Sequence, residues 1–177
     1  FVEHGYEATT VDDIAAAAGL PERDIFRYFA TKEDIVLGKF DLASDDMLHT
    51  LRSRPMDEPV WTSLHRVFDL FASFSDAPGQ QAFAVPLYRV IFEAPPLIAG
   101  YRHKLQKLQD AVVALLVERA ARTGTPYRVD DPTPRALTAS AFGCLVAAQY
   151  SWLASGATGS FSDAVDRAMS VVGPPRP

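Results

Sequence analysis

The segment 10–32 constrains the fold most, because it predicts two short helices that meet at Gly19. Thr10 can cap the first helix with its hydroxyl group, two aspartates suit its positive end, and a run of alanines favours helix. Gly19 can adopt the left-handed conformation that ends a helix, and Leu20 stands where a hydrophobic residue would fill the corner. The pattern predicts a helix-turn-helix.

The second helix of this unit is predicted to begin at Pro21, a residue that the first turn of a helix tolerates. Ile25 and Phe29 are separated by one helical turn, so both would face the first helix near Ile14. The side chains that would then point outward are Glu22, Arg23, Phe26 and Arg27.

Residues at fixed spacings in this region resemble the DNA-binding domain of TetR-family transcriptional regulators. The matching positions are Phe1, Gly5, Tyr6, Thr9, Thr10, Val11, Ile14, Ala15, Ala18, Gly19, Leu20, Ile25, Phe26, Arg27, Tyr28, Phe29, Lys32 and Glu33. The resemblance implies that residues 21–29 form a recognition helix, which lies in the major groove of DNA.

The resemblance also implies individual DNA contacts. Phe26 and Tyr28 match aromatic residues that pack on or bond to the phosphate backbone, and Lys32 matches a lysine that meets a phosphate. Base reading would fall mainly to Arg23 and Arg27, because a guanidinium group can bond a guanine edge through two hydrogen bonds. The candidate DNA-contacting residues are Thr10, Glu22, Arg23, Phe26, Arg27, Tyr28 and Lys32.

Several of these candidates have a plainer interpretation. Tyr28 and Phe29 can equally support the core, and Glu22 can be only a favourable charge in the first helical turn. Lys32 can be a solvated lysine without a phosphate partner. For the whole unit, the alternative is a retained scaffold that no longer binds DNA.

Charge is the main difficulty for DNA binding. The chain has a net charge of −5, and residues 1–45 contain four basic and ten acidic side chains. Proteins that bind DNA neutralise phosphates with lysine and arginine. Residues 1–5 read as the last turn of a helix closed by Gly5, so we expect the rest of that helix and a short, often basic arm to precede Phe1.

Catalysis and metal binding have little support in the sequence. Cys144 is the single cysteine, which excludes an intrachain disulfide and a multi-cysteine metal site, and its apolar helix predicts that it is buried. The four histidines are scattered, and no nucleophile motif or glycine-rich phosphate loop is present. We therefore expect no enzyme activity, no cofactor and no metal.

The remainder of the chain predicts helices separated by proline and glycine. They are expected over residues 32–52, 59–76, 80–93 (with Pro86 inside or at a break), 95–124, 136–155 and 162–172. The first of these would join both parts of the protein, so a shift of its far end would move the recognition helix. The predicted fold is all-α, with a helix-turn-helix DNA-binding domain at 1–45 and a helical ligand-binding and dimerisation domain at 46–177.

Residues 136–162 contain no charged side chain, which raises the possibility of a transmembrane helix. Polar residues and glycines interrupt the apolar run, so we expect a helix buried on both sides and a cytoplasmic protein that does not enter the membrane. Leu137, Ala141, Leu145 and Trp152 would face the subunit's own core. The other side, rich in alanine, serine and Gly143, would approach another helix.

The TetR resemblance implies that the last two long helices pair with their twins in a two-fold dimer, and that the helices before them enclose a ligand cavity. The candidate ligand contacts, each of which can also be a core or surface residue, are Phe68, Phe71, Tyr88, Arg89, Tyr101, Gln106, Gln149 and Trp152. We predict a ligand-responsive repressor that a small apolar effector releases from a palindromic double-stranded DNA operator. The alternative is a helical homodimeric module that binds small molecules or proteins and does not bind DNA.

Overall fold

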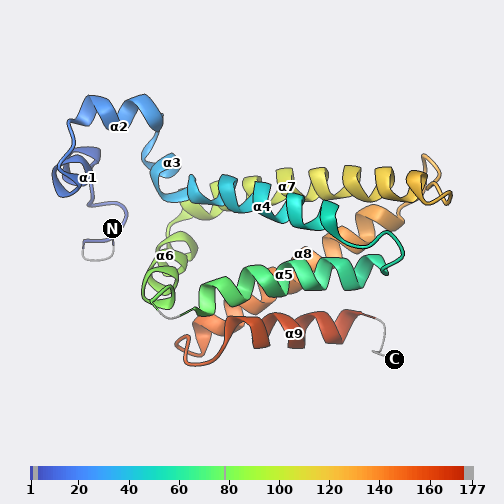
Figure 1. Cartoon of the computed structure of the whole chain (residues 1–177). Coiled ribbons are helices and arrows are strands. Elements are labelled where there is room, and N and C mark those ends of the chain that lie inside the picture. The colour runs from blue at the N-terminus through green and yellow to red at the C-terminus, as the bar shows by residue number, and fades with distance from the viewer. Residues whose placement is uncertain (2–3, 78, 174–177) are drawn as a thin grey trace.

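The computed structural model describes residues 1, 4–77 and 79–173, and this part of the chain consists of helices joined by short loops (Figure 1). The helices are α1 (Val11–Ala18), α2 (Glu22–Tyr28), α3 (Lys32–Leu37), α4 (Lys39–Ser53), α5 (Val60–Asp76), α6 (Gln81–Glu93), α7 (Pro95–Arg122), α8 (Thr133–Ala154) and α9 (Phe161–Val172). The predicted all-α class is confirmed.

Helices α1 and α2 form the predicted helix-turn-helix, which stands apart from the long helices at one end of the molecule (Figure 1). The hydroxyl of Thr10 accepts the N–H of Asp13 at 3.1 Å, and the carboxylate of Asp13 accepts the N–H of Thr10 at 2.8 Å. This reciprocal capping box satisfies two backbone donors at the start of α1. Gly19 ends α1 with a φ of +66°, a conformation that glycine adopts without a steric penalty.

The corner between α1 and α2 differs from the prediction in one respect. Leu20, expected to fill the corner, is 50% exposed. Ala15 and Ile25 are the buried residues of these two helices, so a small side chain on α1 lets α2 approach and the corner needs no larger plug. Phe29 ends α2 and is half-buried.

The single helix predicted over residues 32–52 is two helices, because the chain bends at Gly38 (Figure 1). The carbonyl oxygen of Gly38 accepts the N–H of Asp41 at 3.1 Å. This bond spans three residues, as in a 3₁₀-helix, where an α-helical bond spans four. A Cβ atom at Gly38 would lie 2.8 Å from the carbonyl oxygen of Asp34 and 3.2 Å from the ring of Phe29. The bend therefore depends on glycine, and it separates the direction of α3 from that of α4.

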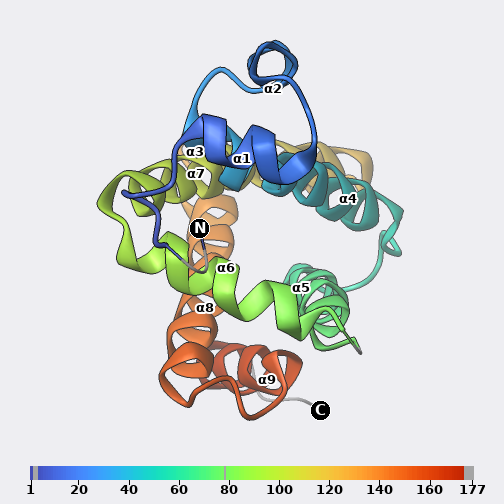
Figure 2. The same ribbon diagram turned by 90° about the vertical axis from the view of Figure 1, so that its left-hand side faces the viewer.

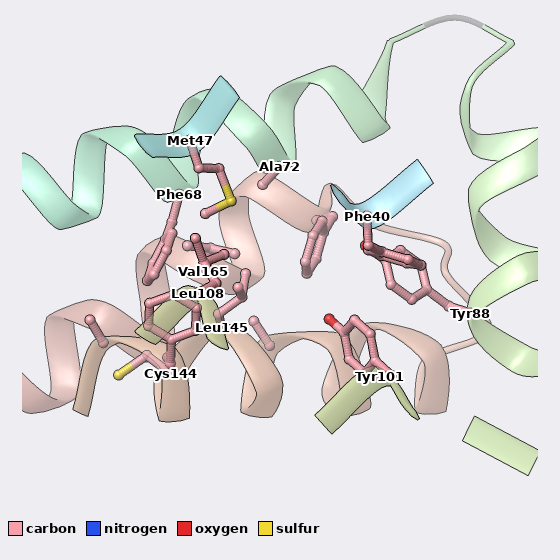
Figure 3. Packing of buried hydrophobic residues seen from close by; sticks show 14 of the residues in the cluster. Phe40, Met47, Phe68, Ala72, Tyr88, Tyr101, Leu108, Cys144, Leu145 and Val165 are labelled. Atoms are coloured by element: carbon pink, nitrogen blue, oxygen red, sulfur yellow. The ribbon is translucent and has the colours of Figure 1, made fainter. Parts of the chain in front are cut away.

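The long helices pack around one hydrophobic core (Figures 1 and 3). Helix α9 packs on both α5 and α8, and α7 packs on α8 and on α4. Phe68 of α5 and Phe142 of α8 meet edge to face with their ring centroids 5.1 Å apart. The carboxylate of Asp76, at the end of α5, accepts the N–H of Phe161 at 2.8 Å, so α9 begins where α5 ends.

Helix α8 has one buried and one exposed side in the subunit. Of the four residues predicted to face the core, Ala141, Leu145 and Trp152 are buried and Leu137 is half-buried, whereas Gly143 on the other side is exposed. Cys144 is buried as predicted, with its sulfur 3.4 Å from the carbonyl oxygen of Ala168.

Within the described ranges, no single helix combines the length and apolar composition that a membrane crossing requires. The pair α6 and α7 reaches that threshold only when taken together, and the two helices meet at a bend of 105°.

At the N-terminus, Gly5 has a φ of +77° and donates its N–H to the carbonyl oxygen of Phe1 at 2.8 Å. This agrees with the helical turn predicted to end at Gly5, although residues 2 and 3 lie outside the described residues. The domain boundary predicted at 45/46 falls within α4, so this helix passes through both predicted domains.

Candidate DNA interface and ligand cavity

Helix α2 carries five of the predicted DNA-contacting residues, and all of them are exposed. The side chain of Arg23 is 85% exposed, and Phe26 and Arg27 are also exposed. Tyr28 is 70% exposed, so it does not support the core. The guanidinium group of Arg27 donates to the hydroxyl of Tyr28 at 2.6 Å and lies 4.9 Å from the centre of its ring. Two arginines one turn apart therefore project from the helix, and one of them is oriented by an aromatic neighbour.

Thr10 and Glu22 lie at the starts of α1 and α2 and are both exposed. The hydroxyl of Thr10 donates to the carboxylate of Asp13 at 2.7 Å, in addition to its capping role. The side chain of Asp12 forms a hydrogen bond with Glu22 and repels its charge, and both effects raise the pKa of the Glu22 carboxyl group. Two acidic side chains are thus neighbours at this end of the unit.

Lys32 lies behind this surface at the start of α3. Its ammonium group donates to the carbonyl oxygen of Tyr6 at 2.8 Å and to that of Thr9 at 3.2 Å. It also lies 4.1 Å from the centre of the Tyr6 ring. The side chain is therefore engaged with the segment that precedes α1.

A cavity of about 580 Å³ lies between α4, α5 and α6. Figure 2 shows these three helices around the centre of the molecule, with the helix-turn-helix above them. The lining residues are Lys39, Phe40, Leu42, Ala43, Asp46, Met47 and Thr50 of α4, Val67, Leu70, Phe71 and Ser75 of α5, and Gln80, Phe83, Ala84 and Tyr88 of α6 and the residue before it. Most of the wall is apolar, and a few polar groups are set into it, as in sites that bind small organic molecules.

Two of the eight predicted ligand contacts line this cavity, Phe71 and Tyr88. Tyr88 is buried, and Figure 3 shows its ring beside that of Phe40, with 6.1 Å between the centroids. Burial raises the pKa of the Tyr88 hydroxyl to about 12. Lys39, the first residue of α4, also lines the cavity, and desolvation lowers the pKa of its ammonium group.

The other six predicted ligand contacts lie elsewhere, and each has a structural reason. Phe68 and Trp152 are core residues, and the indole N–H of Trp152 donates to the carbonyl oxygen of Gly159 at 2.7 Å. Tyr101 and Gln149 are buried together and hydrogen-bonded to each other, with 2.7 Å between the Gln149 amide nitrogen and the Tyr101 hydroxyl. Arg89 and Gln106 are exposed on the surface of α6 and α7.

The sequence analysis missed the contribution of α4 to the cavity. In the structure, Leu42, Leu70 and Phe83 are large apolar residues that are 71%, 61% and 76% exposed, and all three line the cavity. Leu42 was the one of them that the sequence could have indicated. Leu42 is the single large apolar residue in the segment 41–46 of α4, which otherwise contains aspartates, a serine and an alanine. An apolar residue on the polar side of an amphipathic helix can mark a binding surface.

The arrangement defines a class of protein. A helix-turn-helix with exposed arginines is joined, through α3 and α4, to a helical domain whose cavity is partly walled by α4. Helix-turn-helix units place their second helix in the major groove of DNA. The fold and the cavity are those of a ligand-responsive DNA-binding regulator.

Comparison with known families identifies the group within this class. The family model for bacterial regulatory proteins of the tetR family matches residues 1–38, and the model for the MftR C-terminal domain matches residues 58–177. The chain belongs to the TetR family of transcriptional regulators. The predicted resemblance is therefore confirmed.

Two curated relatives agree with this assignment. The chain is 28% identical over 143 residues to the HTH-type transcriptional regulator TcmR of Streptomyces glaucescens, a match that covers 78% of this chain and 62% of TcmR. It thus spans less than two thirds of the length of TcmR. It is 30% identical over 176 residues to a Mycobacterium tuberculosis protein that carries the name mycofactocin biosynthesis transcriptional regulator MftR, covering 98% of this chain and 83% of that protein.

A solved structure shares the fold. The fatty acid degradation regulator FadR from Bacillus halodurans superposes with a TM-score of 0.64 at 21% sequence identity. The superposition covers 96% of this chain and 86% of FadR. At this identity the likeness extends to the arrangement of helices and not to the ligand.

Proposed function

We propose that this chain is a cytoplasmic, homodimeric repressor that binds a palindromic operator through α2 and is released by a small apolar effector. The observation that carries the proposal is the position of α4. This helix forms one wall of the 580 Å³ cavity, and it is joined to the helix-turn-helix through the bend at Gly38 and α3. A change in the cavity can therefore move the recognition helix.

The DNA contacts of this proposal come from the exposed residues of the helix-turn-helix. Arg23 and Arg27 would read bases in the major groove, and Phe26 and Tyr28 would pack against the phosphate backbone. Thr10 would approach a phosphate at the start of α1, and Glu22 would accept a hydrogen bond from a cytosine amine if it meets a base. The exposure of these side chains supports their assignment.

Dimerisation would occur through α8 and α9. The exposed side of α8 carries small residues, including Ala139, Gly143 and Ala147, and these would allow a second helix to approach closely. A two-fold axis at this surface would present two recognition helices to successive major grooves, which are about 34 Å apart on one face of DNA. A palindromic operator follows from that symmetry.

The effector would occupy the cavity between α4, α5 and α6. Its volume falls within the range of about 300 to 1,000 Å³ that small-molecule sites commonly have, and most of its lining residues are Phe, Leu, Ala, Met and Val. An effector can weaken operator binding only as far as it binds the released arrangement more tightly than the DNA-bound one. We propose that a tilt of α4 distinguishes the two arrangements, and that the protein has no catalytic activity.

A gel-shift experiment tests this function directly. The full-length protein, including any residues before Phe1, is mixed with the DNA upstream of its own gene, at several salt concentrations. We expect a sequence-specific complex that weakens as salt increases. If no such complex forms with or without cellular metabolites, the alternative of a helical homodimeric module that does not bind DNA is correct.

A further inference from the structure

The cavity between α4, α5 and α6 combines an apolar interior with a lysine at its opening (Figure 2). We infer that Lys39 selects the ligand: the effector is an apolar molecule that carries an anionic oxygen group, and the Lys39 ammonium binds that group. The inference rests on the proposed function in so far as this cavity is taken as the effector site.

The interior of the cavity suits an apolar body. Five of its lining residues are buried, namely Phe40, Met47, Val67, Ala84 and Tyr88. Burial of apolar surface against such side chains favours binding and does not depend on the charge of the ligand. The interior therefore explains why a ligand binds, but not which polar group it carries.

The opening of the cavity is formed by lining residues that remain accessible to solvent. Leu42, Leu70 and Phe83 are exposed, and so are Lys39 and Asp46. A ligand whose apolar body fills the interior would place its other end among these residues. An anionic group at this position keeps part of its hydration, so it loses less free energy than it would in the interior.

Lys39 is the only cationic side chain among the described residues that line the cavity. Within the described part of the chain, its ammonium group forms no ion pair and donates no hydrogen bond. It lies 5.5 Å from the centre of the Phe40 ring, which attracts the charge without neutralising it. Although the residue is accessible, neighbouring groups desolvate the ammonium enough to lower its pKa. A charge in this state is stabilised by an anion.

The carboxylates on the same helix do not supply that anion. Asp41, two residues after Lys39, is bound by the ammonium group of Lys104 at 2.6 Å. Asp46 lines the cavity seven residues after Lys39, which is about 10 Å along the helix axis. Asp46 would repel an anion at its own end of the opening. The two charges of α4 thus favour one direction of binding, with the anionic group beside Lys39.

Two fluorescent probes with the same aromatic skeleton test this selection. One is 1-anilinonaphthalene-8-sulfonate, and the other is N-phenyl-1-naphthylamine, which lacks the sulfonate and is neutral. Both are titrated into the DNA-free, full-length protein. We expect Lys39→Met to lower the affinity for the sulfonate at least about threefold, because a partly desolvated ion pair contributes more than an exposed one. The affinity for the neutral probe should not change, and Lys39→Arg should behave like the wild type.

Three control variants separate a direct contact from other effects. Lys107→Met makes the same change at an exposed site of α7 that does not line the cavity, and should alter neither affinity. Asp46→Asn removes a negative charge from the opening, so it should raise the affinity for the sulfonate alone. Ala43→Trp fills the cavity from α4 and should lower both affinities.

The outcomes are as follows for the selection by Lys39. Equal losses for both probes in Lys39→Met would show that the side chain acts through the shape of the cavity, and an unchanged sulfonate affinity would show that Lys39 does not bind the anion. Either result overturns the inference. If Lys39→Met does not fold, as judged by circular dichroism, the wild type decides: the ratio of sulfonate to neutral-probe affinity must fall as salt increases, and a constant ratio overturns the inference.

The proposed function fails separately from this inference. If the wild-type protein forms no specific complex with DNA, it is not a repressor, while the ratio of probe affinities still tests Lys39. If the protein binds its operator and the ratio is the same in Lys39→Met and the wild type, the repressor proposal stands and the selection by Lys39 is wrong.

Discussion

Arg119 of α7 donates a hydrogen bond to the carbonyl oxygen of Glu58 at 2.8 Å, which fixes the loop that follows α4. The same guanidinium group donates to the hydroxyl of the buried residue Ser63 at 3.2 Å and to the carbonyl oxygen of Pro55. The end of α4 that is remote from the helix-turn-helix is therefore attached to α7. If α4 tilts when the effector binds, this end is the pivot.

We predict that Arg119→Met destabilises the protein by about 1 to 3 kcal/mol, because partly buried acceptors lose a charged donor. Urea unfolding followed by circular dichroism measures this difference. Arg122→Met removes an exposed arginine three residues later on the same helix, 4.0 Å from the carboxylate of Glu118, and should cost less than about 0.5 kcal/mol. Equal effects of the two substitutions would contradict the pivot.

The pH dependence of stability should show the ion cluster around Glu58. Hydrogen bonds from Arg54 lower the pKa of the Glu58 carboxyl group from 4.5 to about 2, and Ser63 acts in the same direction. A carboxylate whose pKa is lowered by folding stabilises the protein above its unfolded pKa, and this contribution is lost as the pH falls from about 4.5 toward 2. Unfolding free energies should fall less steeply in this window for Glu58→Gln than for the wild type; parallel curves would refute the assignment.

Operator binding should depend on the two exposed arginines of α2. We predict that Arg23→Ala combined with Arg27→Ala weakens specific binding by about 100-fold or more, since one bidentate base contact contributes about 1 to 3 kcal/mol. Arg128→Ala together with Arg135→Ala removes two exposed arginines of the other domain and serves as the matched control. Fluorescence anisotropy with labelled operator DNA is the measurement, and unchanged affinity in the α2 double variant would exclude the proposed reading mode.

The cavity should be blocked by a large side chain introduced from α4. Ala43 lines the cavity, so Ala43→Trp should lower the affinity for the fluorophore 1-anilinonaphthalene-8-sulfonate, an anion whose aromatic rings bind apolar sites, about tenfold or more by filling the space that the probe needs. Ala82→Trp places the same side chain on the exposed side of α6 and should leave probe binding unchanged. Equal probe binding by both variants, as measured by fluorescence titration, would place the apolar site elsewhere.

The dimer interface can be tested at Gly143. A Cβ atom at this position would have no protein atom of the same subunit within 4 Å, so a larger residue is tolerated by the subunit itself. We predict that Gly143→Arg yields a folded monomer with at least about tenfold weaker operator binding, because two half-sites no longer cooperate. Light scattering coupled to size-exclusion chromatography gives the mass. A dimeric Gly143→Arg protein would show that α8 does not form the interface.

The local structure of the helix-turn-helix could be predicted because its determinants are close in sequence. A capping hydroxyl at Thr10, a left-handed residue at Gly19 and a one-turn spacing between Ile25 and Phe29 act within a few residues of each other. The same holds for the limits of α5, α7 and α9, which the proline and glycine positions mark. The need for glycine at position 38 could not be predicted, because it arises from the close approach of the Asp34 carbonyl oxygen and the Phe29 ring in the folded chain.

The sequence by itself determined the all-α class, the helix-turn-helix and the family, since capping, helical periodicity and residue spacing are local properties of the chain. Only the tertiary structure decided which residues surround the cavity and where Lys32 points. Tyr101 and Gln149 are 48 residues apart and satisfy each other in the core, whereas Lys39 and Phe83 line the same cavity from different helices. Such pairings depend on how helices pack against one another, and a side chain's own helix does not specify its partner across the interface.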